Sequence, residues 1–349
     1  MNAVFEQSGA GTSARSGALP VDLRGRPLRD LRVSVIETCN YRCPYCMPED
    51  LTPDETALDR ARRLSFEDIE AAVRSFVRLG VRKVRLTDGE PLLRKNLPEL
   101  VARLAAIPGI EDLALTTNGS LLASKATELH AAGLHRLTVS LDALDPEVFR
   151  AMSGGRGEVS DVLEGIRAAE AAGFKSIKLN TVVQRGVNEH QVLPLVEYFR
   201  GTPHVVRFIE YMDVGTCNGW RQELVVPSRE LRDCIAGRWP LRALSPSYRG
   251  EVAARHGFED GQGEVGFVSS VSEPFCGDCH RARLSADGQL FSCLFASAGS
   301  DLRAALGQGE DALTERIASL WGIRGDRYSE LRNTGGRKSK KIEMFFIGG

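Results

Sequence analysis

Residues 31–46 read LRVSVIETCNYRCPYC, an apolar strand pattern that leads directly into three closely spaced cysteines. Cys39, Cys43 and Cys46 are separated by three and then two residues, so their thiolates can converge on one metal centre. Three thiolate ligands on a four-iron cluster leave one iron open to a substrate or cofactor. A closed zinc site needs four ligands, and no histidine lies near this loop. The stretch therefore favours an iron–sulfur centre at the end of a strand.

Beyond this stretch, short β-rich runs alternate with helical patterns as far as Tyr211. Each β-rich run consists mainly of Val, Ile, Leu and Thr, as expected of parallel strands that are covered on both faces. The predicted strands are Leu31–Ile36, Val81–Thr87, Asp112–Thr116, Arg136–Leu141, Ser176–Val183 and Val205–Glu210. The helical patterns between them are Ser65–Leu79, Asn96–Ile107, Leu121–Ala132, Glu158–Ala172 and Asn188–Arg200.

Such a repeat predicts an α/β fold in which helices pack outside a parallel sheet. Six units are too few for a closed eight-stranded barrel, so the sequence favours an open, partial barrel or a doubly wound sheet. In both folds the ligand site lies at the carboxyl ends of the strands. Polar residues lie at the ends of five predicted strands, in the segments 37–46, 87–91, 116–119, 140–142 and 210–213, and within the fifth strand, in segment 178–180. We therefore expect these segments to share one site.

The composition narrows the class of protein. The chain has 349 residues, 42% of them apolar and 26% charged, which indicates one large or two ordinary globular domains. Its net charge is 45 − 46 = −1, so no global positive field indicates a nucleic acid partner, and no apolar run is long enough to span a membrane. Residues 1–20 lack the pattern of a signal peptide and are predicted to be a disordered segment. We expect a cytoplasmic protein, in which structural disulfides are rare.

A second group of three cysteines lies near the end of the sequence. Cys276, Cys279 and Cys293 flank the segment 280–288, which reads HRARLSADG. Cys217 and Cys234 belong to neither group and are interpreted as ordinary thiols. Two groups of three cysteines in a chain of this composition predict metal binding or redox chemistry at two centres.

The first group, with Tyr45 before its third cysteine and Gly89-Glu90-Pro91 after the second strand, resembles the radical S-adenosylmethionine (radical SAM) superfamily. The resemblance implies a partial (βα)6 barrel at residues 21–215. It also implies that Cys39, Cys43 and Cys46 hold a 4Fe-4S cluster that binds S-adenosyl-L-methionine and cleaves it to a 5′-deoxyadenosyl radical.

The second group is more specific. Together with segments 207–215 and 325–329 and the terminal Gly348-Gly349, it resembles the GTP 3′,8-cyclase family of molybdenum cofactor biosynthesis, from about Leu28 to the last residue. The resemblance implies a lyase-class enzyme that converts GTP to (8S)-3′,8-cyclo-7,8-dihydroguanosine 5′-triphosphate. Residues 216–349 then carry a second 4Fe-4S cluster, which is held by Cys276, Cys279 and Cys293 and binds the purine.

The resemblance also implies roles for individual residues. The S-adenosylmethionine contacts carried over are Tyr45, Gly89, Ser140 and Met212. The GTP contacts carried over are Arg32, Arg85, Thr116, Lys178, Arg281, Ala282 and Arg283, of which Arg281 and Arg283 are also counted as catalytic. Arginine forks bind phosphate oxygens in bidentate fashion, so a local group of arginines can bind a triphosphate although the whole chain is nearly neutral. The two terminal glycines are expected to reach the catalytic site.

Two segments depart from the family pattern. Asp88-Gly89 stands where the family usually has two glycines, and Ile36-Glu37-Thr38 stands where it usually has Thr-Asp-Arg. Aspartate is among the few residues that tolerate a left-handed backbone, so we expect the bend at Asp88 to be preserved.

The family implies further partners, namely a flavodoxin or ferredoxin type electron donor and the next pathway enzyme, cyclic pyranopterin monophosphate synthase. The protein is expected to be a monomer or a homodimer. One alternative is another two-cluster radical SAM enzyme that modifies a peptide, although such enzymes usually carry more cysteines in this region. A second is a zinc- or RNA-binding module built from Cys276–Cys293 and the basic stretch Arg337–Lys341. Only His280 could complete its zinc site, and no aromatic platform accompanies the basic residues.

Overall fold

The computed structural model describes residues 19–50, 62–332 and 341–347. Residues 1–18 of the predicted disordered segment 1–20, most of the basic stretch at 337–341 and the terminal Gly348-Gly349 therefore lie outside the described residues. All six predicted strands are present, with ends that differ from the prediction by two residues at most. They are β1 (Asp30–Ser34), β2 (Lys83–Thr87), β3 (Asp112–Thr117), β4 (Arg136–Ser140), β5 (Lys178–Val183) and β6 (Val205–Glu210).

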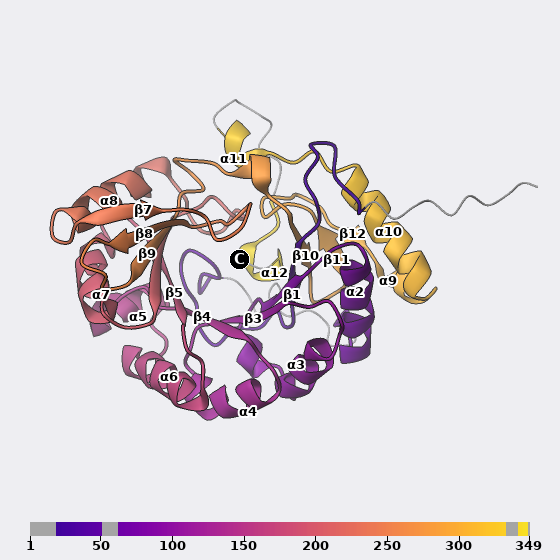
Figure 1. Cartoon of the computed structure of the whole chain (residues 1–349), viewed down its shortest axis with the longest axis horizontal. Coiled ribbons are helices and arrows are strands. Elements are labelled where there is room, and N and C mark those ends of the chain that lie inside the picture. Colours follow the sequence, from indigo (N-terminus) through magenta and orange to yellow (C-terminus); the bar gives the residue numbers. More distant parts are fainter. Residues whose placement is uncertain (1–18, 51–61, 333–340, 348–349) are drawn as a thin grey trace, which may run out of the picture.

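Helices follow the strands and cover the outside of the ring that the strands form (Figure 1). They are α2 (Phe66–Arg78), α3 (Leu97–Ala105), α4 (Ala126–Ala131), α5 (Pro146–Met152), α6 (Val159–Ala172), α7 (Val192–Phe199) and α8 (Ser228–Ala236). Helix α5 was not predicted. Helices α4 and α7 are shorter than expected because a 3-10 turn occupies the first part of each predicted stretch. Within the described residues, no helix combines the length and apolarity needed to cross a bilayer.

Helix α2 illustrates how local sequence sets an element. Ser65 accepts a hydrogen bond from the backbone N–H of Asp68, whose carboxylate accepts one from the N–H of Ser65, so the helix begins with a capping box. Gly80 ends the turn with φ +106°, a backbone conformation that favours glycine. The apolar face of α2, including Ile69 and Phe76, is buried in the hydrophobic core.

The C-terminal region extends the parallel sheet at both of its edges. The strand order is β12-β11-β10-β1-β2-β3-β4-β5-β6-β9-β8-β7. Strand β9 (Glu264–Val268) pairs in parallel with β6, and β10 (Arg281–Leu284) pairs in parallel with β1. Eight strands thus run parallel, and the outer additions are the antiparallel β7 (Leu241–Leu244), β8 (Ala254–Phe258), β11 (Gln289–Phe291) and β12 (Ser300–Asp301). The fold is the expected partial barrel, with edges supplied by residues beyond the predicted repeat.

Each strand divides its side chains between two environments. On β1, Leu31 and Val33 are at most 1% exposed and belong to the hydrophobic core, whereas Arg32 between them lines the interior of the ring. On β10, Ala282 and Leu284 lie in that core, and the two arginines alternate with them. In the remainder of the described chain, the helices are α9 (Arg303–Leu306), α10 (Glu310–Gly322), α11 (Tyr328–Leu331) and α12 (Met344–Ile347). Figure 1 shows α12 inside the ring.

Residues 269–280 connect β9 to β10 and so join the two edges of the partial barrel. Glu210, at the end of β6, is fully buried and holds the start of this connection. One carboxylate oxygen accepts from the backbone N–H groups of Val271 (2.8 Å) and Ser272 (2.9 Å), and the other accepts from the N–H of Ser228 (2.8 Å) and the hydroxyl of Ser272. This single side chain therefore ties β6, α8 and the connection that carries Cys276 and Cys279.

We predict that Glu210→Ala lowers the free energy of unfolding by about 3 kcal/mol, because one buried and two partly buried backbone donors lose their acceptor. Glu210→Gln keeps one acceptor oxygen and should lose about half as much. Urea unfolding of the two variants measures both values. Equal stabilities of wild type and Glu210→Ala would show that water satisfies these donors.

Candidate functional site

The loop after β1 places the first three cysteines. Cys43 accepts hydrogen bonds through its carbonyl oxygen from the N–H groups of Cys46 and Met47, both at 2.9 Å, which folds residues 43–47 into a turn. The sulfur of Cys39 accepts from the N–H of Tyr41 at 3.4 Å. Burial raises the pKa of Cys39 to about 11 and also raises the pKa values of Cys43 and Cys46. Without a metal, these thiols are therefore protonated at neutral pH.

The loop after β2 approaches this cysteine loop through its backbone. A Cβ atom on Gly89 would lie 2.3 Å from the carbonyl oxygen of Thr38, so only glycine fits there. Asp88 has φ +73°, which confirms the expectation that aspartate preserves the bend, and its carboxylate accepts a hydrogen bond from the Ser34 hydroxyl. Glu90 is fully buried and accepts from the N–H groups of Leu92 (3.0 Å) and Asn118 (2.7 Å).

Two further residues were predicted to contact S-adenosylmethionine: Tyr45, which lies in the cysteine loop, and Ser140, which lies at the end of β4. The Tyr45 hydroxyl donates to Oδ2 of Asp142 at 2.7 Å, which links the cysteine loop to the segment after β4. Burial raises the pKa of Asp142 to about 6. Ser140 ends β4 and stands beside Asn180 of β5 in register.

A cavity of about 1260 Å³, which includes space open to solvent, occupies the interior of the partial barrel. Nine of the predicted site residues line it, and they come from both halves of the chain: Arg32, Arg85, Thr116, Met212, Cys276, Cys279, Arg281, Arg283 and Cys293. The cavity thus brings the second group of cysteines together with most of the predicted GTP contacts. The first cysteine group, Tyr45, Gly89, Ser140, Lys178 and Ala282 are not among the described residues that line it.

Arginine side chains crowd one wall of this cavity. Arg32 stands between Arg283 and Arg85 in the sheet register. Burial lowers the pKa values of Arg85 and Arg283 to about 10, and neighbouring arginines contribute to both shifts. Arg85 donates to the hydroxyl oxygens of Thr116 (2.9 Å) and Thr138 (2.8 Å). The wall is therefore a concentrated positive charge directed at the cavity.

Lys178 and Ala282 differ from the other predicted GTP contacts. Burial lowers the pKa of Lys178 to about 7, and the cations of Arg207 and Arg136 lower it further. Lys178 therefore belongs to the same cationic cluster although it does not line the main cavity. Ala282 is fully buried in the hydrophobic core between two cavity-lining arginines, so any substrate contact there would use its backbone.

The second group of cysteines is positioned by arginines. Arg281 donates to the sulfur of Cys279 at 3.5 Å and Arg324 donates to it at 3.3 Å. Burial acts to raise the pKa of Cys279, but these two cations outweigh burial and lower the pKa to about 5. Burial raises the pKa of Cys293 to about 11, and its sulfur accepts from the N–H of Phe295 at 3.5 Å.

The end of the described chain enters the same cavity region. Arg283 donates to the carbonyl oxygen of Ile347 at 3.2 Å, and Ile347 is fully buried. The preceding segment is held by the loop after β6: Lys341 donates to Oδ2 of Asp213 at 2.6 Å, and Glu343 accepts from the N–H (2.9 Å) and hydroxyl (2.6 Å) of Thr216. The contact between Ile347 and Arg283 places the last described residue beside a predicted GTP contact.

Several cavity residues were missed in the sequence. Arg207 and Asp30 line the cavity, and Arg324 donates to the sulfur of Cys279 from outside it. Lys178 was carried over from the family resemblance, but a charged residue inside a strand that is covered on both faces needs a partner, and this signal applies to Arg207 as well as to Lys178. Arg324 lies outside any predicted repeat, so no comparable signal pointed to it.

The cysteines fit iron–sulfur clusters by their donor chemistry, because both groups present three thiols on short loops beside backbone N–H donors. Among the described residues, no three cysteine, histidine, aspartate or glutamate side chains are arranged to hold a single metal ion. His280, the residue that a zinc site would need, faces elsewhere: its Nε2 lies 3.0 Å from the carbonyl oxygen of Arg249 and its Nδ1 lies 3.6 Å from Asp30.

Two family profiles together match most of the chain. The profile described as "Radical SAM superfamily" matches residues 33–199, and the profile described as "Molybdenum Cofactor Synthesis C" matches residues 204–330. With the partial barrel and the cysteine loop after its first strand, these matches define a radical SAM enzyme.

Full-length relatives make the assignment narrower. The GTP 3′,8-cyclase of Xanthomonas campestris pv. campestris (strain 8004) is 65% identical over 334 residues, which cover 96% of this chain and 98% of the relative. The GTP 3′,8-cyclase of Acidothermus cellulolyticus is 49% identical, with 94% and 98% covered. The chain belongs to the GTP 3′,8-cyclase family.

Solved structures agree with the fold. The crystal structure of Streptococcus suis SuiB bound to S-adenosylmethionine matches with a TM-score of 0.61, and the match covers 90% of this chain and 70% of the SuiB chain. The sequence identity is 15%, so the similarity is one of fold alone.

We predict that inorganic triphosphate binds this cationic cluster more tightly at about pH 6 than at about pH 8. Because the pKa of Lys178 is about 7, the lysine is charged at the lower pH and must take up a proton on binding at the higher pH. Its contribution is complete below pH 7 and weakens by up to about tenfold per pH unit above it. Calorimetry in buffers of different ionisation enthalpy measures both the affinity and the proton uptake.

Lys178→Arg is the matched control, because a guanidinium stays charged over this pH range. Its affinity should lose the part of the pH dependence that comes from Lys178. The triphosphate itself titrates, so the comparison is between the two proteins at each pH. Identical pH profiles for wild type and Lys178→Arg would contradict the prediction.

Proposed function

We propose that the chain converts GTP to (8S)-3′,8-cyclo-7,8-dihydroguanosine 5′-triphosphate, the first step of molybdenum cofactor biosynthesis. The observation that carries this proposal is the cavity that joins three thiols to a wall of arginines. A nucleoside triphosphate needs many cations for its phosphates and a separate group for its base, and this cavity offers both. The identity of 65% to a GTP 3′,8-cyclase over 96% of the chain supports the same substrate.

In this proposal the two groups of cysteines have different tasks. Cys39, Cys43 and Cys46 hold the first 4Fe-4S cluster, beside the S-adenosylmethionine contacts Tyr45, Gly89, Ser140 and Met212. When bound, the cluster and S-adenosylmethionine supply the radical that abstracts hydrogen from the ribose. The backbone of Gly89 approaches the cysteine loop closely enough to leave no space for a side chain, so the cofactor can lie against main-chain groups there. Cys276, Cys279 and Cys293 hold the second cluster.

The arginines position the substrate. Arg32, Arg85 and Arg283 face the cavity from three neighbouring strands, so they can contact several phosphate oxygens without a change of backbone. Arg281 lines the same cavity and donates to the sulfur of Cys279, so it can hold the nucleotide close to the second cluster. An anion in the cavity also relieves the repulsion among these cations. Fixed cations on rigid strands hold the ribose in one orientation toward the radical source.

Anaerobic incubation with reductant, S-adenosylmethionine and GTP, followed by mass analysis, tests the proposal. A product with the mass of GTP and the 3′,8-cyclised structure, formed together with 5′-deoxyadenosine, is the expected result. Formation of 5′-deoxyadenosine without any change in GTP would contradict it. The same assay with other nucleoside triphosphates tests the preference for guanine.

Family membership also suggests the surroundings of the reaction. We infer a flavodoxin or ferredoxin type electron donor, transfer of the product to cyclic pyranopterin monophosphate synthase, and a cytoplasmic location. We keep the division into a barrel at residues 21–215 and a C-terminal region at 216–349, with the qualification that β9 and β10 of the second part complete the sheet of the first.

We predict that the two cysteine groups are separable by mutation. Cys39→Ala, Cys43→Ala or Cys46→Ala should abolish cleavage of S-adenosylmethionine, because the radical-generating cluster loses a ligand. Cys276→Ala, Cys279→Ala or Cys293→Ala should leave part of the cleavage intact and abolish the product from GTP. Quantifying 5′-deoxyadenosine and cyclised product in the same reactions distinguishes the two outcomes. Equal loss of cleavage in both sets would refute the separate roles.

We also predict that Glu343 anchors the C-terminal segment for catalysis. Its carboxylate accepts hydrogen bonds from Thr216 and from the thiol of Cys217 (2.8 Å), and α12 follows it into the barrel. Glu343→Ala should reduce cyclisation by about tenfold or more, because the segment beside Arg283 then keeps only the Lys341 contact to the loop after β6. Cleavage of S-adenosylmethionine should change much less. Deletion of Gly348-Gly349 should give the same pattern, and a Glu343→Ala enzyme with wild-type cyclisation would refute the anchor.

A further inference from the structure

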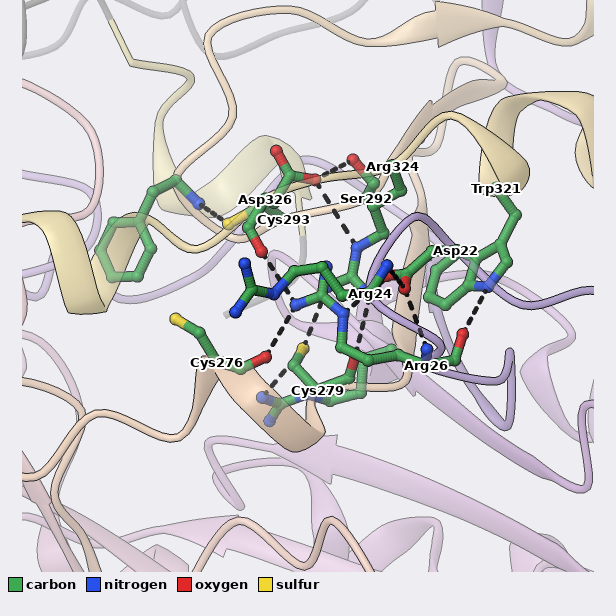
Figure 2. Close-up of polar contacts among 12 residues, drawn as sticks. Asp22, Arg24, Arg26, Cys276, Cys279, Ser292, Cys293, Trp321, Arg324 and Asp326 are labelled. Carbon is green, nitrogen blue, oxygen red and sulfur yellow. Dashed lines mark hydrogen bonds and ion pairs between the residues drawn. The ribbon is translucent and has the colours of Figure 1, made fainter.

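Arg324 lies directly behind the second group of cysteines and is only 4% exposed. Figure 2 shows its guanidinium pointing at Cys279. One nitrogen donates to the carbonyl oxygen of Cys279 at 2.7 Å, and the other donates to the Cys279 sulfur at 3.3 Å. The side chain therefore fixes both the backbone and the sulfur of one cysteine.

A buried network from the beginning of the chain holds Arg324 in this orientation. Asp22, which is 4% exposed, lies 3.2 Å from the Arg324 guanidinium and 2.6 Å from that of Arg26. The ring of Trp321 packs 4.5 Å from the Arg324 guanidinium carbon, and its indole N–H donates to the carbonyl oxygen of Arg26 at 3.1 Å. Three segments that are distant in the sequence thus fix one cation against one sulfur (Figure 2).

The position of Arg324 distinguishes it from Arg281, the other arginine on this sulfur. Arg281 lines the main cavity, where it can contact a substrate. Arg324 is not among the described residues lining that cavity and lies instead at a separate depression with Trp321 and Asp326. A cation that contacts the sulfur but not the substrate space acts on whatever Cys279 binds, and not on the substrate directly.

We propose that Arg324 is a positioning residue for the second cluster, which it serves by fixing Cys279 as a ligand and raising the reduction potential of the cluster. The proposal rests on the assignment of Cys276, Cys279 and Cys293 as ligands under the proposed function. Hydrogen bonds to the sulfurs and nearby charge set the potentials of iron–sulfur clusters, and outer contacts orient their ligands. A positive charge beside the sulfur stabilises the reduced cluster, which carries one more negative charge than the oxidised cluster.

Arg26 provides a matched control. It is 3% exposed, it pairs with the same Asp22, and it donates to the carbonyl oxygens of Cys276 (2.7 Å) and Asp326 (2.8 Å). Its hydrogen bonds therefore hold the same loop through backbone oxygens, whereas Arg324 contacts the sulfur. Arg324→Met and Arg26→Met both remove a buried arginine from one network, but only the first removes a donor from Cys279 sulfur.

The experiment is a redox titration, followed by electron paramagnetic resonance, of full-length protein in which Cys39, Cys43 and Cys46 are replaced by Ala. Only the second cluster then contributes to the signal. Arg324→Met should lower the ratio of reduced to oxidised cluster at a fixed potential by about tenfold or more, which is 59 mV for a one-electron couple. Arg26→Met should change it by less than about threefold. Arg324→Lys, which keeps the charge without the fork, should fall between Arg324→Met and the unsubstituted arginine.

The remaining measurements separate this role from a loss of folding. Metal-free Arg324→Met and Arg26→Met should unfold at similar urea concentrations, since each leaves Asp22 one partner. If Arg324→Met holds less iron than Arg26→Met at equal stability, and Arg324→Lys restores it, the positioning role is supported. Equal potentials and equal iron contents in the two Met variants would overturn the proposal. Absence of any cluster when Arg324 and Arg26 are both intact would refute the underlying ligand assignment instead.

Discussion

Arg283, Arg32 and Arg85 occupy neighbouring register positions on β10, β1 and β2 and face the same cavity. Adjacent strands are about 4.8 Å apart, so the positive charges of these side chains repel one another. Burial of Arg32 lowers its pKa well below the usual value, and the charges of neighbouring arginines add to that shift. Such a cluster of arginines on rigid strands is suited to bind an anion, because a bound anion offsets the repulsion among the guanidinium groups.

The C-terminal region is what converts this wall into a site. Strand β10 contributes both Arg281 and Arg283, and the connection that leads to it contributes Cys276 and Cys279. Because β9 and β10 pair with opposite edges of the predicted six-stranded sheet, the connection between them must cross the open side of the barrel. The same geometry therefore completes the sheet and delivers thiols to the cavity. Glu210 holds the beginning of that connection, and Arg324 holds its end.

The sequence predicted most of the fold because the six βα units are local patterns. The predicted helical stretch Ser65–Leu79 contains α2, whose ends are set by local residues, a capping box at Ser65 and a left-handed Gly80. The placement of β9 and β10 could not be predicted in this way, since parallel pairing at a sheet edge depends on contacts between residues far apart in the chain. The cysteines were found because their spacing is local. Arg324 was missed because its partners Asp22 and Cys279 are distant from it in the sequence and only the fold brings them together.

The two cysteine groups differ in the environment that the fold gives them. Burial raises the pKa of Cys39 to about 11, and it also raises the pKa values of the other two thiols in that group. Metal binding there must release protons, and its affinity must therefore rise with pH. At the second group, burial opposes ionisation of Cys279, but Arg281 and Arg324 outweigh it and lower the pKa to about 5. Arg281 thus faces the thiolate on one side and the cavity on the other, whereas Arg324 contacts the thiolate from outside the cavity. Arg281 can therefore act on both the second cysteine group and the cavity ligand, whereas at the first group no described arginine outweighs the burial that raises the pKa values of the thiols.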